Sequence, residues 1–369
     1  MPLKESYVIW NNKGGVGKTT LTFHMATRYA SRNPGVHVLV IDLCPQANVS
    51  MALLTSPEKQ GNEQLSKLFK EEKTISAFLQ KMIEMGPVLD AKRHVTRVCD
   101  FNIQVPTNLF LLCGDMCLEL VGRGLDHHRL GMDMPRYKPW KHVTSSIRSF
   151  IEGLPEKVTG VSESEAEWVV FIDTNPSFAV YTEIALAAAN KLIIPINADD
   201  FSKEAVRAML DLVYGISPEE EQEHFSAYRG YMFSHKARTY DLKLPEIHLL
   251  INNRTTITST RRVTRSAKAF EAMGKENLKV LFDAYQQHQR GKKCFAPRKM
   301  EIADITTFKQ QYFQDVQDFH TTAILSIHTG CPLAGLCGKV SFSEEASVNV
   351  KQSQVKDYLK RLNDLVKKL

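Results

Sequence analysis

The sequence predicts an α/β fold, a doubly wound, mainly parallel sheet with helices on both faces. Short apolar runs that are typical of buried strands alternate along the chain with stretches of helical periodicity. The first run leads directly into a glycine-rich turn at residues 13–20, and two later runs end in Asp42 and Asp173. Because open α/β sheets bind ligands at the carboxyl ends of their strands, these features indicate one functional edge.

The first strand and the turn after it carry the clearest motif. Residues 6–11 predict a buried strand and residues 19–30 a helix, which is the context that a phosphate-binding loop requires. Glycines let backbone N–H groups approach a phosphate closely, and the helix N-terminus adds its positive dipole end. We expect Lys18 to contact the β- and γ-phosphates and the Thr19 hydroxyl to face Mg²⁺. The residues expected to contact the nucleotide here are Lys13, Gly14, Gly15, Val16, Gly17, Lys18, Thr19 and Thr20.

The remaining elements follow in the order of a doubly wound sheet. Residues 36–41 predict a second buried strand, and residues 168–173 predict a strand that delivers its final aspartate to the Mg²⁺ side of the loop. Further strands are expected at 108–115, 191–195 and 247–252, with helices between them. We expect one domain over residues 1–369, with largely helical insertions at 55–107, 116–165 and 215–246.

The loop departs from the common phosphate-loop pattern, because Asn12 stands where the first glycine would be and Lys13 follows it. Together with the two strand-end aspartates, this arrangement resembles the ParA/MinD family of deviant Walker A P-loop ATPases, and ParA-type partition ATPases most closely. The resemblance implies ATP and Mg²⁺ as cofactors and a homodimer that forms with ATP. It also implies slow hydrolysis of ATP to ADP and phosphate, stimulated by a partner protein.

The resemblance assigns roles to single residues. In the family the front lysine, here Lys13, crosses the dimer interface to the partner's phosphates; the alternative is that it holds only its own. Asp42 is expected near the metal and the attacking water, and Asn253 beside the adenine, although Asn252 competes for that place. The expected catalytic residues are then Lys13, Lys18 and Asp42, and the expected metal-holding residues are Thr19, Asp42 and Asp173. The chain departs from the family pattern at Cys44, Ala47 and Asn175.

Positive charge is concentrated late in the chain. Residues 251–310 contain thirteen Lys/Arg against five Asp/Glu, whereas the chain as a whole carries a net charge of +6. Localised positive charge is typical of surfaces that meet phosphate backbones or anionic lipid. In ParA-type relatives, basic residues of this region bind DNA without sequence preference. The resemblance therefore implies duplex DNA as a partner, with a ParB-like stimulating protein, and contacts from Arg261, Arg262, Arg265 and Lys268.

The last segment, residues 354–369, predicts an amphipathic helix with an apolar stripe at Val355, Leu359, Leu362, Val366 and Leu369. Packing on the sheet is favoured over membrane contact, because the stripe lacks Phe or Trp to insert into lipid. Two alternatives to a partition ATPase remain open. One is a MinD-like positioning ATPase at the membrane, and the other is a metabolic enzyme of the same fold that activates a carboxylate with ATP.

Composition favours a cytoplasmic protein, associated with the nucleoid if it binds DNA. The seven cysteines are odd in number and form no C-x-x-C pair, so we expect reduced thiols rather than a disulfide framework or a zinc site. No signal peptide and no apolar stretch of membrane-spanning length is expected from the sequence.

Overall fold

A central sheet organises the computed structural model, which describes residues 3–85, 91–135, 137–154, 167–197, 200–216, 230–255, 265–288, 294–317, 320–341 and 347–369. Within these residues the strand order is β3-β4-β2-β5-β1-β6-β7-β8, and every pair is parallel except β3 with β4. The strands are β1 (Leu3–Ile9), β2 (His37–Leu43), β3 (Thr96–Arg97), β4 (Leu109–Leu112), β5 (Trp168–Thr174), β6 (Lys191–Asn197), β7 (Glu246–Thr255) and β8 (Phe313–Gln317). The predicted fold class is confirmed.

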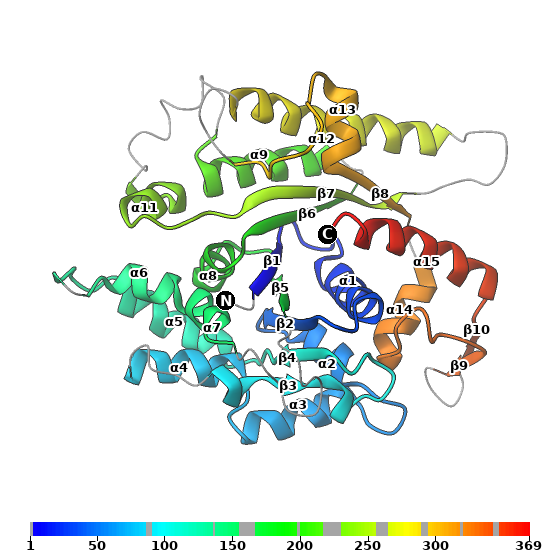
Figure 1. The fold of residues 1–369 in the computed structure, drawn as a ribbon, viewed down its shortest axis with the longest axis horizontal. Coiled ribbons are helices and arrows are strands. Elements are labelled where there is room, and N and C mark those ends of the chain that lie inside the picture. The colour runs from blue at the N-terminus through cyan, green and yellow to red at the C-terminus, as the bar shows by residue number, and fades with distance from the viewer. Residues whose placement is uncertain are drawn as a thin grey trace.

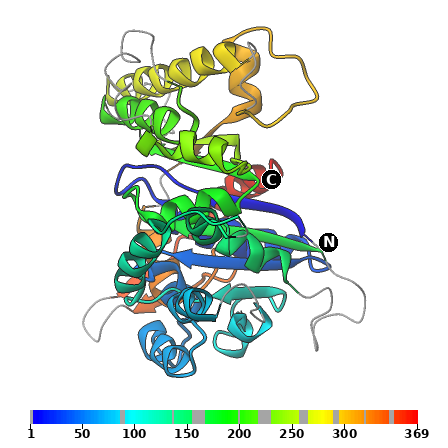
Figure 2. The same ribbon diagram turned by 90° about the vertical axis from the view of Figure 1, so that its left-hand side faces the viewer.

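Two hydrophobic cores lie on opposite faces of the sheet, because successive strand residues point to opposite sides. Tyr7 and Ile9 join one core, and Val8 and Trp10 join the other. The first core is covered by α1 (Lys18–Arg32), α2 (Asn48–Leu54), α3 (Gly61–Lys70), α14 (His320–Thr329) and α15 (Gln352–Val366). The second is covered by α4 (Ile75–Met85), α5 (Leu118–Arg129), α6 (Pro139–Thr144), α7 (Ser146–Glu152), α8 (Val180–Ala188), α9 (Asp200–Tyr214), α11 (Phe233–Thr239), α12 (Arg265–His288) and α13 (Ile305–Tyr312). Figures 1 and 2 show these two helical layers around the sheet.

The register of the central strands creates the functional edge. In the β2–β5 pair Asp42 lies opposite Asp173, and in the β1–β5 pair Ile9 lies opposite Asp173. The chain leaves β1 directly into the glycine-rich turn, so this turn and both aspartates meet at the carboxyl ends of three adjacent strands. This is the position that the strand-end motifs predicted.

Four short strands, β3, β8, β9 and β10, were not expected from the sequence. The strand β8 at the end of the sheet was not predicted, because its sequence, FQDVQ, contains no apolar run. A small hairpin of β9 (Lys339–Ser341) and β10 (Ser347–Asn349) was also not predicted. The described residues of 55–107 form α3 and α4, and then short 3-10 turns at Ala91–His94 and Val98–Asp100 with the two-residue strand β3 between them. That these helices are insertions into a single domain stays a prediction.

The last helix, α15, packs on the molecule with its apolar stripe inward. Its buried residues centre on Tyr358 and Leu365, with Val355, Leu362 and Val366 beside them, and they belong to the core that contains α1. Leu359, which was expected in the stripe, is partly exposed. This arrangement is the packing that the sequence favoured over membrane contact. Among the described residues, no helix is both long and apolar enough to span a membrane.

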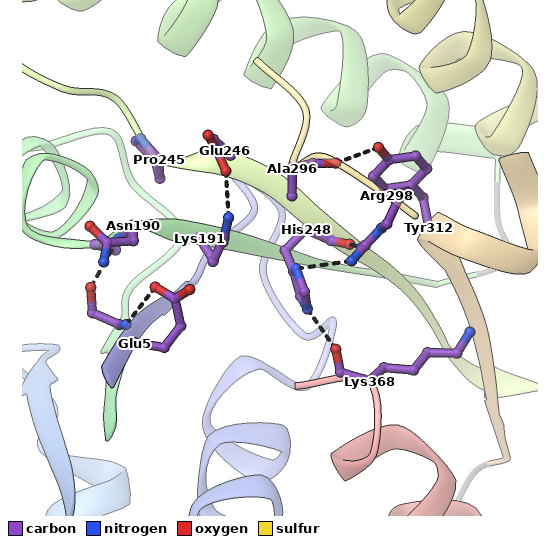
Figure 3. Close-up of polar contacts among 12 residues, drawn as sticks. Glu5, Asn190, Lys191, Pro245, Glu246, His248, Ala296, Arg298, Tyr312 and Lys368 are labelled. Carbon is purple, nitrogen blue, oxygen red and sulfur yellow. Dashed lines mark hydrogen bonds and ion pairs between the residues drawn. The ribbon is translucent and has the colours of Figure 1, made fainter. Parts of the chain in front are cut away.

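Polar contacts tie the opposite, amino-terminal edge of the sheet to the end of the chain (Figure 3). Arg298 lies over the ring of Tyr312, 4.6 Å from its centroid, and donates to the backbone oxygen of His248. The His248 ring in turn lies 2.8 Å from the backbone oxygen of Lys368. These contacts hold α15 in place at a distance from the functional edge.

Candidate phosphate-binding site

The glycine-rich turn between β1 and α1 has the backbone that close phosphate approach requires. Gly15 and Gly17 both have positive φ, at 71° and 87°. A Cβ on Gly17 would lie 2.3 Å from Nδ2 of Asn253, so both the backbone angle and the space there require glycine. Gly17 also immediately precedes α1, and its oxygen accepts the hydrogen bond from the Leu21 N–H, 2.8 Å away. The free N–H groups of the first turn of α1 therefore face the same space as the loop.

Lys18 curls back across the loop. Its Nζ donates to the backbone oxygens of Asn11, at 3.1 Å, and Lys13, at 2.9 Å. Burial lowers the pKa of Lys18 to about 8, and the nearby Asp173 carboxylate opposes that change. A phosphate in the loop would stabilise the charged ammonium that burial disfavours. The position of Lys18 therefore suits the phosphate contact that was predicted for it.

Asp173 connects the end of β5 to the start of α1. Its Oδ2 accepts from the Thr19 hydroxyl at 2.8 Å, and its Oδ1 accepts from the Thr22 hydroxyl at 3.1 Å. The carboxylate is fully buried. Burial and then repulsion from Asp42 raise the pKa of Asp173 above its ordinary value. The structure thus brings together Thr19 and Asp173, two of the three residues predicted to hold a metal.

Asp42 lies at the end of β2, and its carboxylate is fully buried. Its carboxylate accepts three hydrogen bonds, from Cys44 N at 3.1 Å, Ser50 N at 3.0 Å and Ser50 Oγ at 2.7 Å. A Cβ on Gly114 would lie 2.7 Å from Cγ of Asp42, so the β4 end closes over it. Burial raises the pKa of Asp42, and the Ser50 and Cys44 hydrogen bonds partly oppose this. Asp42 holds the start of α2, and its predicted part at the metal and the water stays a prediction.

Asparagine side chains hold the loop from the neighbouring strands. Asn253 Nδ2 donates to the oxygen of Val16 at 3.0 Å, and Asn197 Nδ2 donates to the oxygen of Gly15 at 3.3 Å. Asn252 instead faces away and donates to Asp315 at 2.8 Å. Of the two candidates at the end of β7, Asn253 is therefore the one beside the loop.

A cleft of about 660 Å³ opens in front of the loop. Two residues that depart from the family pattern, Cys44 and Asn175, line this cleft. It is also lined by an acidic residue that was not predicted from the sequence, Glu119. The strand-end rule could have found Glu119, because it lies shortly after β4, the neighbour of β2. The residues lining the cleft are Gly14, Gly15, Gly17, Lys18, Thr19, Thr20, Cys44, Pro45, Gln46, Asn48, Glu119, Thr174, Asn175 and Pro176.

The predicted DNA contacts are placed only in part. Arg261 and Arg262 lie outside the described residues. Arg265 and Lys268 belong to the first turns of α12, and their side chains are not described.

In the part of the chain that is described, no cluster of three or more His, Cys, Asp or Glu residues could hold a metal by itself.

Comparison with known proteins shows a similarity over about half of the chain. A model of an AAA domain matches residues 5–108 and 156–225. ParA family proteins of Mycoplasma genitalium and Chlamydia muridarum are 23% and 25% identical to the chain over 203 and 205 residues. Over these residues the chain is similar to ParA family proteins. The resemblance predicted from residues 13–20 and the strand-end aspartates is confirmed.

The extent of the ParA likeness is limited. An uncharacterised protein of Methanocaldococcus jannaschii is 27% identical over 210 residues. The matched parts cover 55–56% of this chain and only 62–63% of the M. jannaschii, M. genitalium and C. muridarum proteins. Among solved structures, McdA of Cyanothece in complex with ATP has a TM-score of 0.56 at 15% identity, covering 99% of this chain and 95% of McdA. The pnob8 ParA structure has a TM-score of 0.52 at 15% identity, covering 99% of this chain and 96% of that chain. These structures share the fold.

Proposed function

We propose that the chain is an ATP-dependent switch of the ParA type, which binds and slowly hydrolyses ATP. The observation that supports this most directly is that Lys18 and Thr19 line one cleft at the carboxyl edge of the sheet, while the buried Asp173 accepts a hydrogen bond from Thr19. A protein with the same fold, McdA of Cyanothece, has a solved structure in complex with ATP. A cleft of about 660 Å³ also lies within the range of small-molecule sites, roughly 300–1,000 Å³.

The cleft also fits Mg²⁺. Two fully buried carboxylates, Asp42 and Asp173, lie opposite one another in neighbouring strands, and repulsion from Asp42 contributes to the raised pKa of Asp173. A dication held by Thr19 and Asp173 would neutralise this excess of negative charge. Mg²⁺ typically binds one or two protein oxygens and completes its shell with water and phosphate oxygens, so a larger protein cluster is not needed. Bound there, it would supply the charge that offsets the triphosphate.

The proposed reaction is attack of water on the γ-phosphate of ATP, which releases ADP and phosphate. Catalysis of this type depends mainly on positioning and on electrostatic stabilisation. Lys18 is placed to stabilise charge on the phosphates, and the asparagines of β6 and β7 hold the loop in shape. Lys13 of a second copy would add positive charge as a dimer forms across the nucleotide. ATP binding would thus favour the dimer, and hydrolysis would release it.

The biological role we propose is partition of a plasmid or chromosome through sequence-independent DNA binding, with a stimulating partner protein. The positive charge of residues 251–310 and the relation to ParA proteins support this role. Contacts of Arg and Lys with phosphates would make the binding weaken steeply with salt. Arg265 and Lys268 would contribute from the start of α12.

The test is the steady-state ATPase rate of the wild type and of Lys13→Ala, each with and without duplex DNA of arbitrary sequence. Lys70→Ala, an exposed lysine at the end of α3, is the matched control. We expect slow hydrolysis by the wild type and the control, a loss of tenfold or more in Lys13→Ala, and DNA binding that requires ATP. A wild type that neither hydrolyses ATP nor binds DNA at low salt would contradict the proposal.

A further inference from the structure

The lining of the cleft includes a carboxylate with no assigned role. Among the described residues that line the cleft, Glu119 of α5 is the one acidic side chain. The two aspartates at the strand ends are fully buried beneath the loop. Their oxygens accept hydrogen bonds from Thr19, Thr22, Ser50 and Cys44. Glu119 is therefore the carboxylate that the fold presents to whatever occupies the cleft.

A residue of α8 forms a hydrogen bond with Glu119. The buried Tyr181 hydroxyl donates to Oε2 of Glu119 at 3.3 Å. The same hydroxyl accepts from Asn175 Nδ2 at 3.1 Å, so a hydrogen-bonded chain runs from the segment after β5 to Glu119. Gly122 permits this contact, because a Cβ there would lie 3.3 Å from the Tyr181 ring. Helices α5 and α8 lie against one another in Figure 1, and their contact fixes the side chain at the cleft.

Cys44 is another ionisable side chain that lines the cleft. Burial and then the Asp42 charge raise the pKa of the Cys44 thiol to about 12. The thiol therefore stays protonated near neutral pH and is a poor proton acceptor. A carboxylate at the cleft surface has the acceptor oxygens that an attacking water needs.

We propose that Glu119 orients the water that attacks the γ-phosphate, with Tyr181 as its positioning residue. This inference rests on the proposed ATPase function. The water oxygen forms a bond to the γ-phosphorus as the bond to the β–γ bridging oxygen breaks, and that bond's electron pair leaves with ADP. One water proton passes to the Glu119 carboxylate and then to solvent, which restores the site.

The experiment separates binding from the chemical step. Affinity for a fluorescent N-methylanthraniloyl ATP and the single-turnover rate with saturating Mg·ATP are measured for the wild type, Glu119→Gln and Tyr181→Phe. Glu152→Gln, an exposed glutamate at the end of α7, is the control. We expect Glu119→Gln to keep the affinity within twofold and to lower the rate at least tenfold. Tyr181→Phe should lower the rate about threefold, but have no further effect when combined with Glu119→Gln.

Each other result is decisive. If the wild type hydrolyses ATP and Glu119→Gln matches Glu152→Gln, the inference is wrong while the proposed function stands. The same holds if rate and affinity fall together, or if the Tyr181 and Glu119 effects simply add. If the wild type binds the nucleotide but does not hydrolyse it, the proposed function and the inference both fail.

Discussion

Replacing Asp173 by asparagine should stabilise the protein in the absence of nucleotide. The wild-type carboxylate is fully buried, repelled by Asp42, and has a pKa raised above its ordinary value of 3.8. The folded state therefore holds its proton more tightly than the unfolded state does. Wild-type stability should fall as pH rises from that ordinary value through the raised folded value, because the unfolded chain then ionises freely and the folded chain cannot.

The size of the effect follows from two opposing terms. Each unit of raised pKa costs about 1.4 kcal/mol of folding free energy once the pH exceeds both values. The pKa of Asp173 is raised to about 7, roughly three units, so the ionised carboxylate costs about 4 kcal/mol at pH 8. The introduced asparagine keeps an oxygen to accept from Thr19 or Thr22, but its amide nitrogen cannot accept from the other hydroxyl, which costs about 1–3 kcal/mol. We expect a net gain of about 2 kcal/mol at pH 8. An unfolding entropy of about 2.1 cal/mol/K per residue, over 369 residues, converts this to about 2–3 °C in Tm.

The assay is thermal and urea unfolding of both proteins between pH 4 and pH 8.5, without and with Mg·ATP. The gain of Asp173→Asn should appear at high pH and vanish near pH 4, where the wild-type carboxylate is protonated. With Mg·ATP the order should reverse, because the wild type gains ligand stabilisation that the variant loses. A variant that is less stable than the wild type at pH 8 without ligand, or a difference that does not depend on pH, would show that the buried charge of Asp173 does not destabilise the wild type.

Three further substitutions test other parts of the account. Gly17→Ala should abolish ATP binding in calorimetry and lower the free energy of unfolding by about 1–2 kcal/mol, because φ is 87° at this residue. The control Gly124→Ala lies in α5 with open space around it and should raise the free energy of unfolding by about 0.5–1 kcal/mol. Ala47→Gly should raise the free energy of unfolding in urea by about 0.5 kcal/mol, because Ala47 has a φ of 51°, which glycine adopts more easily. Ala52→Gly inside α2 should lower it by about 1 kcal/mol. Leu365→Ala should lower the free energy of unfolding by about 3 kcal/mol, because it truncates a buried side chain of α15. Lys360→Ala, at an exposed position of the same helix, should lower it by less than about 0.5 kcal/mol. Equal effects would show that α15 does not pack as described.

The sequence predicted those parts of the fold that local patterns determine. Apolar runs that end in an aspartate located β2 and β5, and the glycine-rich turn located the start of α1. The edge strand β8 could not be found this way, because FQDVQ has a mixed pattern and is recruited by pairing with β7. The predicted apolar stripe of α15 omitted two buried residues, Tyr358 and Leu365. Contact with α1 and the sheet, in addition to helix periodicity, decides that these two side chains face inward.

The candidate site was predictable to a similar depth. Lys18, Thr19 and Asp173 follow from motif and strand order. The direction of the Asp42 carboxylate does not, because it depends on Ser50, eight residues later, and on the close approach of Gly114. The strand-end rule points to the segment after β4, but the packing of α5 against α8 decides that Glu119 is the acidic residue at the cleft. Sequence patterns indicate which strand ends carry the chemistry, and tertiary packing decides which side chains face the cleft.

The most direct test of the central claim is calorimetric titration of ATP into the wild-type protein, once with Mg²⁺ and once with EDTA. We predict one ATP bound per chain, with affinity at least tenfold higher in Mg²⁺, because the phosphate-binding loop lines the cleft and its Thr19 is hydrogen-bonded to the buried Asp173. An absence of binding heat in both titrations, confirmed by unchanged thermal unfolding with ATP, would contradict it. Equal affinity with and without the metal would contradict the part assigned to Thr19 and Asp173.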